Sequence, residues 1–230
     1  MMSATHTHSG LSGIMSNFAY IIIESYGFNP LVFWSVVDGI VEAIEKADAS
    51  LASGKVFWNK GELSNHRNRR MKAYNANPEE ERKMYNHETD RDMMMIRIEN
   101  EDGTPRGSFS WWPVHPISFN GGSNPLVSSD SMGFAALLFD YSMNNGSRAG
   151  TGDFVSAFGS SNLGDVSPSI NGRDDDSNLF GAEECKQMGT LIFNRANEIF
   201  HDMDNMQQLT GAVKHGQRFF KMTNVTVRNL

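Results

Sequence analysis

The sequence holds two strand-like runs on either side of a turn: Met93-Met94-Met95-Ile96-Arg97-Ile98, then Glu101-Asp102-Gly103-Thr104-Pro105, then Gly107-Ser108-Phe109-Ser110-Trp111-Trp112-Pro113-Val114. Both outer runs are rich in residues that are compatible with β-strands, and the glycine and proline between them supply turn chemistry. The pattern therefore predicts a β-hairpin that ends at His115-Pro116.

Strands and helices alternate outward from this hairpin. Short apolar runs predict a strand around residues 56–58 and a buried strand at residues 154–158. Apolar residues at helical spacing predict helices at residues 31–50, 133–143 and 182–200. This alternation indicates an α/β fold, in which a mixed sheet is flanked by helices.

The remaining segments predict loops and two ends that look cut. Residues 65–70, 120–124 and 160–177 carry polar or turn-forming residues without periodicity, which is typical of loops. Residues 219–228 alternate like a strand but stop without a turn, and a dense histidine cluster lies where chains usually fray. We therefore expect residues 1–230 to be an incomplete domain.

Composition limits the classes of function. The 230 residues, 39% of them hydrophobic, suffice for a sizeable core. The net charge of -7 offers no basic field for a phosphate backbone, so nucleic acid is not an expected partner. No apolar run approaches the roughly 20 residues of a membrane-spanning helix, and we expect no signal peptide in this chain. Cys185 is the only cysteine, so cysteine usage does not indicate the compartment.

Three histidines are candidates for a metal site. His6 and His8 are two positions apart, so in an extended segment both imidazoles face the same side. Such a pair suits a metal site or a polar active-site floor, but it is also typical of a surface or hydrogen-bonded pair. His115 stands between a predicted strand and Pro116, where it is either a ligand or a hydrogen-bonded core histidine.

Ser167 and Arg69 are weaker candidates on their own. Ser167 belongs to Gly164-Asp165-Val166-Ser167-Pro168, a glycine-containing loop in which the proline fixes the exit direction of the chain. Its hydroxyl is able to serve a substrate, although the same residues also form ordinary turns. Arg69 lies among other basic residues and by default is a solvated charge.

Five motifs resemble those of the neutral ceramidases in their residues and in their order, along nearly the whole chain. The motifs are Ala4-Thr5-His6-Thr7-His8-Ser9-Gly10; Asn68-Arg69 with Ala73-Tyr74 and Asn77-Pro78; His115-Pro116-Ile117-Ser118; Ser129-Asp130 with Gly133-Phe134-Ala135; and Phe154-Val155-Ser156-Ala157-Phe158 running to Gly164-Asp165-Val166-Ser167-Pro168. The resemblance is specific, because all five motifs would otherwise have to occur by chance in the order that the family shows.

The resemblance implies a zinc-dependent amidohydrolase that splits the N-acyl bond of ceramide into sphingosine and a fatty acid. It implies that His6 and His115 are zinc ligands and that His8 and Arg69 line the substrate pocket. Ser167 resembles the family's essential serine, described either as a nucleophile or as the group that holds the ceramide headgroup hydroxyl. We favour the second role, because zinc provides an activated water and no histidine base adjoins Ser167 in sequence.

The resemblance also implies what lies outside this chain. Family members complete the zinc site with a glutamate and a tyrosine from beyond the strand near Val225, and they end in an immunoglobulin-like domain. We therefore expect residues 1–230 to be part of a catalytic domain, with little activity alone. Ceramide is the expected partner, with a membrane surface for access to it, and the expected location is extracellular or in the secretory-pathway lumen.

Two other functions compete with this prediction. One is a catalytically inactive lipid-binding fragment or homologue, which keeps the fold but lacks a complete zinc shell. The other is a metal-dependent amidase that acts on another substrate. The chain departs from the family at Arg70-Met71, Ile117 and Phe119-Asn120, so the shape of the pocket is open.

Overall fold

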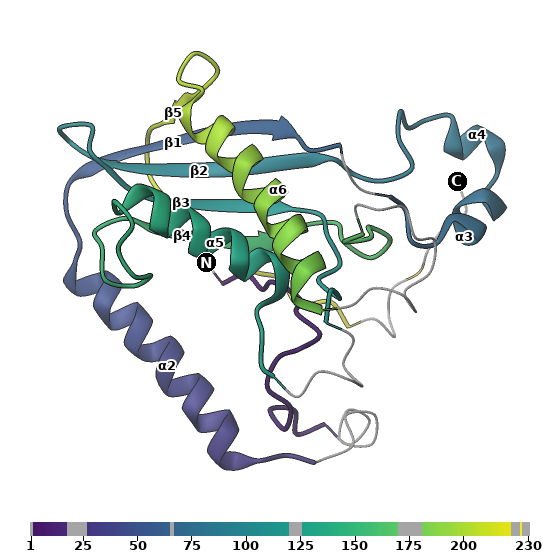
Figure 1. The fold of residues 1–230 in the computed structure, drawn as a ribbon, viewed down its shortest axis with the longest axis horizontal. Coiled ribbons are helices and arrows are strands. Elements are labelled where there is room, and N and C mark those ends of the chain that lie inside the picture. The colour runs from purple at the N-terminus through teal and green to yellow at the C-terminus, as the bar shows by residue number, and fades with distance from the viewer. Residues whose placement is uncertain are drawn as a thin grey trace.

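The computed structural model describes residues 2–17, 27–64, 67–119, 126–169, 181–221 and 226. Its strands form one five-stranded sheet in the order β4-β3-β2-β1-β5 (Figure 1). The strands are β1 (Gly54–Glu62), β2 (Asp92–Asn100), β3 (Pro105–Trp112), β4 (Val155–Ser160) and β5 (Gln207–Leu209). The helices are α2 (Pro30–Ala49), α3 (Met71–Ala76), α4 (Glu79–Arg82), α5 (Asp130–Met143) and α6 (Gly181–His201).

The predicted hairpin is the centre of the sheet. β2 and β3 are antiparallel, with Met95 opposite Ser110, and the turn between them uses Gly103 at a φ of 86°. β1 joins the other edge of β2 antiparallel, whereas β4 runs parallel to β3. A parallel neighbour requires a crossover connection, and α5 lies in that crossover. The α/β fold with a mixed sheet is thus confirmed.

Helices α5 and α6 cover one face of the sheet, as Figure 1 shows. On β2, Met93 and Met95 are fully buried and alternate with partly exposed residues, because only one face is covered. Phe139 of α5 is fully buried, and its ring centroid lies 5.4 Å from that of Phe154 and 5.3 Å from that of Phe200. Gly189 of α6 permits close contact with α5, since a Cβ there would lie 2.8 Å from Ser131 O.

Helix α2 has a well-defined start but no buried residue. The side chain of its N-cap, Asn29, accepts hydrogen bonds from the amides of Leu31 and Val32, and Pro30 follows at the position where proline is favoured. The helix extends away from the sheet in Figure 1. None of the helices among the described residues combines the length and apolar character needed to cross a bilayer.

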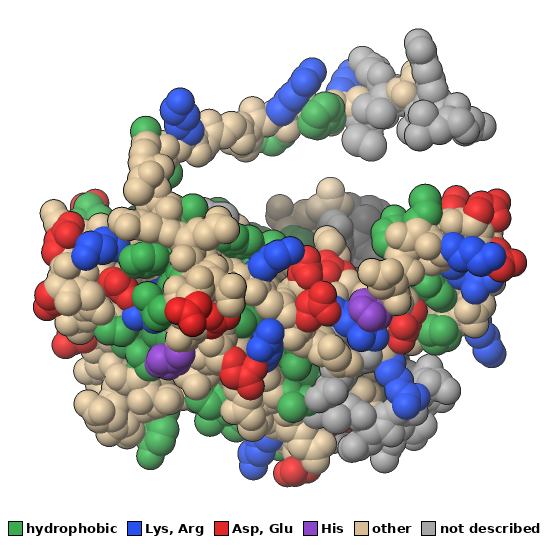
Figure 2. Space-filling model, turned by 90° about the horizontal axis from the view of Figure 1, so that it is seen from above, with side chains coloured by type: hydrophobic (Ala, Val, Ile, Leu, Met, Phe, Trp, Pro, Cys, Tyr) green, Lys and Arg blue, Asp and Glu red, His purple; other side chains and the backbone are tan. Residues whose placement is uncertain are grey.

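The strands differ from the sequence predictions in three respects. β4 is not buried on both faces, since Val155 is 59% exposed. Residues 219–221, the described start of the strand predicted at 219–228, are not a strand, because they are exposed and have no ladder partner in the described part of the chain. Figure 2 shows the segment after β5 as an arm that stands off the body. β5 itself was not predicted, because it has only three residues, two of them glutamines, and all three are exposed.

Only some residues of the predicted loops belong to the described part of the structure. Residues 67–70 contain no helix or strand, although Asn68 forms an isolated bridge with Val166. The predicted loop at 120–124 lies outside the described residues, as do residues 170–177 of the loop predicted at 160–177.

Candidate functional site

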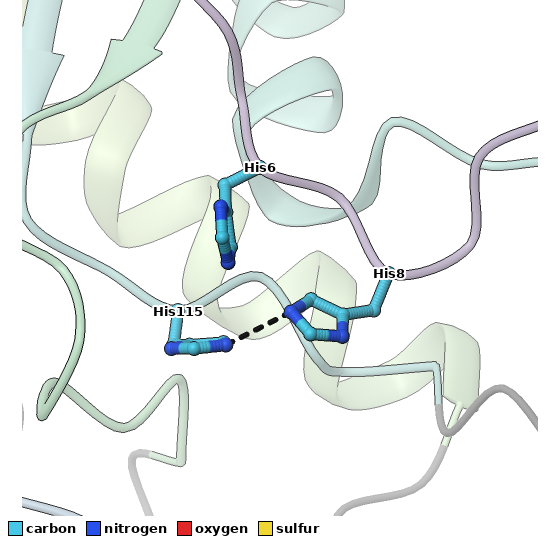
Figure 3. Close-up of side chains that lie close together, drawn as sticks. All are labelled: His6, His8 and His115. Atoms are coloured by element: carbon cyan, nitrogen blue, oxygen red, sulfur yellow. Dashed lines mark hydrogen bonds between the residues drawn. The ribbon is translucent and has the colours of Figure 1, made fainter. Parts of the chain in front are cut away.

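Three histidines from two distant parts of the chain meet beside the sheet (Figure 3). His6 and His8 come from the N-terminal segment, and His115 comes from the loop after β3. One ligand nitrogen from each ring lies within 4.8 Å of the others, and the ring centroids are 4.8–5.1 Å apart. Nε2 of His115 lies 2.9 Å from Nε2 of His8, so in the metal-free protein one imidazole donates a hydrogen bond to the other.

Backbone hydrogen bonds to β4 and to the His115 loop hold the N-terminal segment. The amide of Ser160 donates to Ala4 O at 2.9 Å, and its hydroxyl donates to Thr5 O at 2.8 Å. The amide of His8 donates to Pro116 O at 3.3 Å. His6 has a φ of 61°, so the segment is not the extended strand from which we argued. The two rings nevertheless approach each other, because this left-handed residue turns the chain between them.

His115 is buried and held in its neutral form. The side chain is 7% exposed, and its amide donates to Val166 O at 3.0 Å. Burial first, and then the positive charge of Arg69 and the neighbouring His8 and His6, lower the pKa of His115 from 6.5 to about 4. A neutral imidazole presents a free lone pair, which is the form that binds a metal cation.

Arg69 and Ser167 lie on two segments that pair with each other next to His115. Asn68 and Val166 form an isolated antiparallel bridge. The amide of Arg69 donates to Asp165 O at 2.7 Å, and the amide of Ser167 donates to Arg67 O at 2.8 Å. Because Val166 O also accepts the amide of His115, these three candidate residues are connected through one short ladder.

The side chains of Ser167 and Arg69 differ in exposure. Ser167 is 2% exposed, and its Oγ accepts a hydrogen bond from the amide of Ser169 at 3.2 Å rather than bonding to a histidine. Arg69 is half-buried and donates from Nε to Gly164 O at 3.2 Å. Whether both side chains open onto one cavity with the histidines stays a prediction.

The histidine cluster has the chemistry of a transition-metal site. Zinc–nitrogen bonds are about 2.0–2.1 Å long, so two nitrogens on one ion lie at most about 4 Å apart. The ligand atoms of the three histidines lie within 4.8 Å of one another, which is close to that limit. Imidazole ligands suit zinc, copper, iron and nickel alike, so the donors do not identify the metal. The assignment of His8 to the substrate pocket stays a prediction.

Comparison with known proteins identifies the family. Residues 1–229 match the family model described as neutral/alkaline non-lysosomal ceramidase, N-terminal. The chain belongs to this family. The resemblance found in the five sequence motifs is thereby confirmed.

Individual relatives of the ceramidase family match along most of the chain. Neutral ceramidase B of Dictyostelium discoideum is 36% identical over 255 residues, which cover 99% of this chain and 35% of that protein. Neutral ceramidase of Pseudomonas aeruginosa is 32% identical over 232 residues, which cover 99% of this chain and 33% of that protein. The crystal structure of neutral ceramidase from P. aeruginosa superposes with a TM-score of 0.76 at 31% identity, covering 91% of this chain and 32% of that one. The chain therefore spans about a third of the length of these relatives.

Two residues that build the site carried no role in the sequence analysis. Asn68 stands beside Arg69, and Asp165 stands in the loop that carries Ser167, but neither had a predicted role of its own. Their side chains form a hydrogen bond of 2.9 Å across 97 positions of sequence. The two segments are far apart in the chain, and only the fold shows that they pair.

Proposed function

We propose that this chain supplies the histidine part of a zinc centre that hydrolyses the N-acyl bond of ceramide to sphingosine and a free fatty acid. The observation that carries the proposal is the cluster of His6, His8 and His115 in a chain that matches the ceramidase family along residues 1–229. The relatives' names supply the substrate class. We further propose that residues 1–230 are part of the catalytic domain.

His6 and His115 would hold the zinc ion through neutral imidazole nitrogens. Zinc, when bound, polarises an amide carbonyl and lowers the pKa of a water to about 7. Arg69 carries a permanent positive charge and several N–H donors, which suit an amide oxygen that gains negative charge as the carbonyl is attacked. His8 lies next to both ligands and would orient the substrate beside them.

We assign Ser167 to substrate binding rather than to nucleophilic attack. Its Oγ already accepts the amide of Ser169, which leaves the hydroxyl proton available to donate to a substrate oxygen. A serine nucleophile needs a base in hydrogen-bond contact, and its hydroxyl makes no such contact with a described histidine. A ceramide headgroup hydroxyl fits a donor of this kind.

Metal binding by the isolated chain tests the metal centre. Cobalt(II) titration followed by visible absorption should show one site, which His6→Ala or His115→Ala weakens by about 10–100-fold or more. His87→Ala is the matched control, since His87 is exposed and is not one of the three clustered histidines. Equal cobalt affinity in the wild type and both cluster variants would refute the proposal.

Hydrolysis of a fluorescent ceramide tests the reaction. With added zinc, this chain alone should release little or no fatty acid, because two histidines leave half of a four-ligand shell unfilled. A form extended by the glutamate and tyrosine ligands that the family implies should be active. Ceramide binding without release would favour an inactive lipid-binding protein, and release from other amides alone would favour a different amidase.

We also propose that the substrate is taken from a membrane surface, because ceramide is a lipid. On the basis of the family assignment, we propose an extracellular location or one in the secretory-pathway lumen. A fusion of the extended form to a fluorescent protein, imaged in cells of its source, would test this location.

A further inference from the structure

We propose that Asn68 is a positioning residue, which sets Arg69 and Ser167 relative to His115. Asn68 is 3% exposed although it lies in a loop. Its Nδ2 donates to Glu88 O at 2.8 Å and to Asp165 Oδ2 at 2.9 Å, while its Oδ1 accepts the amide of Arg70 at 2.7 Å. One side chain thus connects three separate segments, and both of its polar atoms are satisfied.

The backbone around Asn68 explains why a side chain is needed there. The bridge between Asn68 and Val166 is isolated, so no extended ladder holds the two segments together. The backbone amides of Arg69 and Ser167 donate across the two segments on either side of it, and the Arg69 side chain donates to Gly164 O. Movement at this bridge would therefore shift Arg69 and Ser167 relative to His115.

The chemistry of the position selects an amide. Donation to a backbone carbonyl and to a carboxylate, together with acceptance from a backbone amide, requires both halves of the asparagine side chain. An aspartate at position 68 would place two carboxylates in contact with each other. An alanine would leave Glu88 O and Asp165 Oδ2 without this donor.

The consequence for catalysis rests on the proposed function. If Arg69 and Ser167 bind the amide oxygen and the headgroup hydroxyl, a displacement of about 1 Å at the bridge costs up to about 100-fold in rate. The Asn68 side chain forms no hydrogen bond to the proposed metal ligands His6 and His115 in the described part of the chain, so metal affinity should hardly change. Asn68 therefore acts through other residues and does not itself contact substrate.

The variants follow from the hydrogen bond between Asn68 and Asp165. Asn68→Ala removes it, Asn68→Asp opposes two carboxylates, and the exchange of both residues, Asn68→Asp with Asp165→Asn, restores a donor and an acceptor. Asn162→Ala is the matched control, because it removes an exposed hydrogen bond of the same length, 2.9 Å, from asparagine Nδ2 to Asp90.

Amide hydrogen exchange in the isolated chain measures the positioning without metal or substrate. In Asn68→Ala, the amides of Arg69 and Ser167 should exchange about tenfold or more faster, after correction for the amide of Ile192 in the core, which reports global opening. The exchanged pair should recover part of the protection that Asn68→Asp loses, because it restores the bond between positions 68 and 165 but not the bond to Glu88 O. Equal exchange in Asn68→Ala and Asn162→Ala would overturn the proposal.

Kinetics separates positioning from a structural role. In the extended form, Asn68→Ala should lower kcat/KM for fluorescent ceramide by about 10–100-fold, while cobalt affinity changes less than about threefold. Faster exchange with unchanged kinetics would reduce Asn68 to a structural residue and overturn the proposal. A wild-type chain that binds no cobalt would refute the proposed function, and hydrogen exchange would still decide whether Asn68 holds the bridge.

Discussion

Acid should destabilise the metal-free chain through His115. Burial first, and then the charge of Arg69, hold the pKa of His115 at about 4 in the folded chain, against 6.5 for an exposed histidine. As pH falls from 6.5, the unfolded state therefore takes up a proton that the folded state does not. The stability from neutral His115 is complete above pH 6.5 and is lost as pH falls toward 4.

The size of the effect follows from the two pKa values. The difference of about 2.5 units corresponds to about 3 kcal/mol, since each unit is worth about 1.4 kcal/mol. About 2.5 kcal/mol of this should be lost by pH 4.5. A loss of that size is a large part of the stability of about 5–15 kcal/mol that is usual for a domain.

Urea unfolding at several pH values in the presence of a chelator measures this loss. The matched variant is His115→Asn, which keeps a polar side chain but does not titrate. Other acidic groups affect both proteins equally, so the difference in unfolding free energy between them isolates His115. That difference should change by about 2.5 kcal/mol between pH 7.5 and 4.5. Parallel losses in the two proteins would refute the reasoning.

Three further predictions concern the core. Phe139→Ala should cost about 3–5 kcal/mol in urea unfolding, because Phe139 is fully buried, whereas Leu137→Ala, at a 53% exposed position, should change stability by about 0.5 kcal/mol at most. Gly189→Ala should lower the melting temperature despite the better helix propensity of alanine, because the added Cβ meets α5, and a higher value would contradict the close approach. Asp140→Asn should cost about 1–3 kcal/mol, because its Oδ1 accepts the amide and hydroxyl of Ser156 at 2.7 and 2.8 Å, and unchanged urea unfolding would exclude this role.

Local periodicity predicted most of the elements but not their partners. The helices at 31–50, 133–143 and 182–200 and the central hairpin agree with α2, α5, α6 and the β2–β3 pair. These elements have a repeat that the sequence displays directly. The position of β5 against β1 had no such signal, because three residues are too few to display a period and pairing between distant strands leaves no local trace.

Buried charge was another feature that periodicity did not reveal. Arg97 and Glu99 occupy the covered face of β2, where the alternating pattern suggests apolar residues. They form a buried ion pair, and Arg97 also donates to Phe200 O at 2.6 Å and lies 4.3 Å from the centre of that ring. Tertiary contacts from α6 make these charges acceptable, and no local pattern encodes such contacts.

The site was predicted by motif order and not by spacing. The segment that carries His6 and His8 is not extended as the spacing suggested, since His6 is left-handed. The meeting with His115 spans 107 positions, and only the resemblance to a family proposed it. The roles of Arg69 and Ser167 stay predictions, because hydrogen bonds show where these side chains lie and not what they bind.

The attachment of the N-terminal segment to the end of β4 has a consequence for biosynthesis. The hydroxyl that donates to Thr5 O belongs to Ser160, which is synthesised 155 positions later in the chain. At translation rates of about 5–20 residues per second, the interval is roughly 8–30 s. During that time His6 and His8 are already made but have no anchor at β4. The anchoring of the candidate metal centre is therefore completed only after β4 has been synthesised, although all three histidines are in the chain once residue 115 has been made.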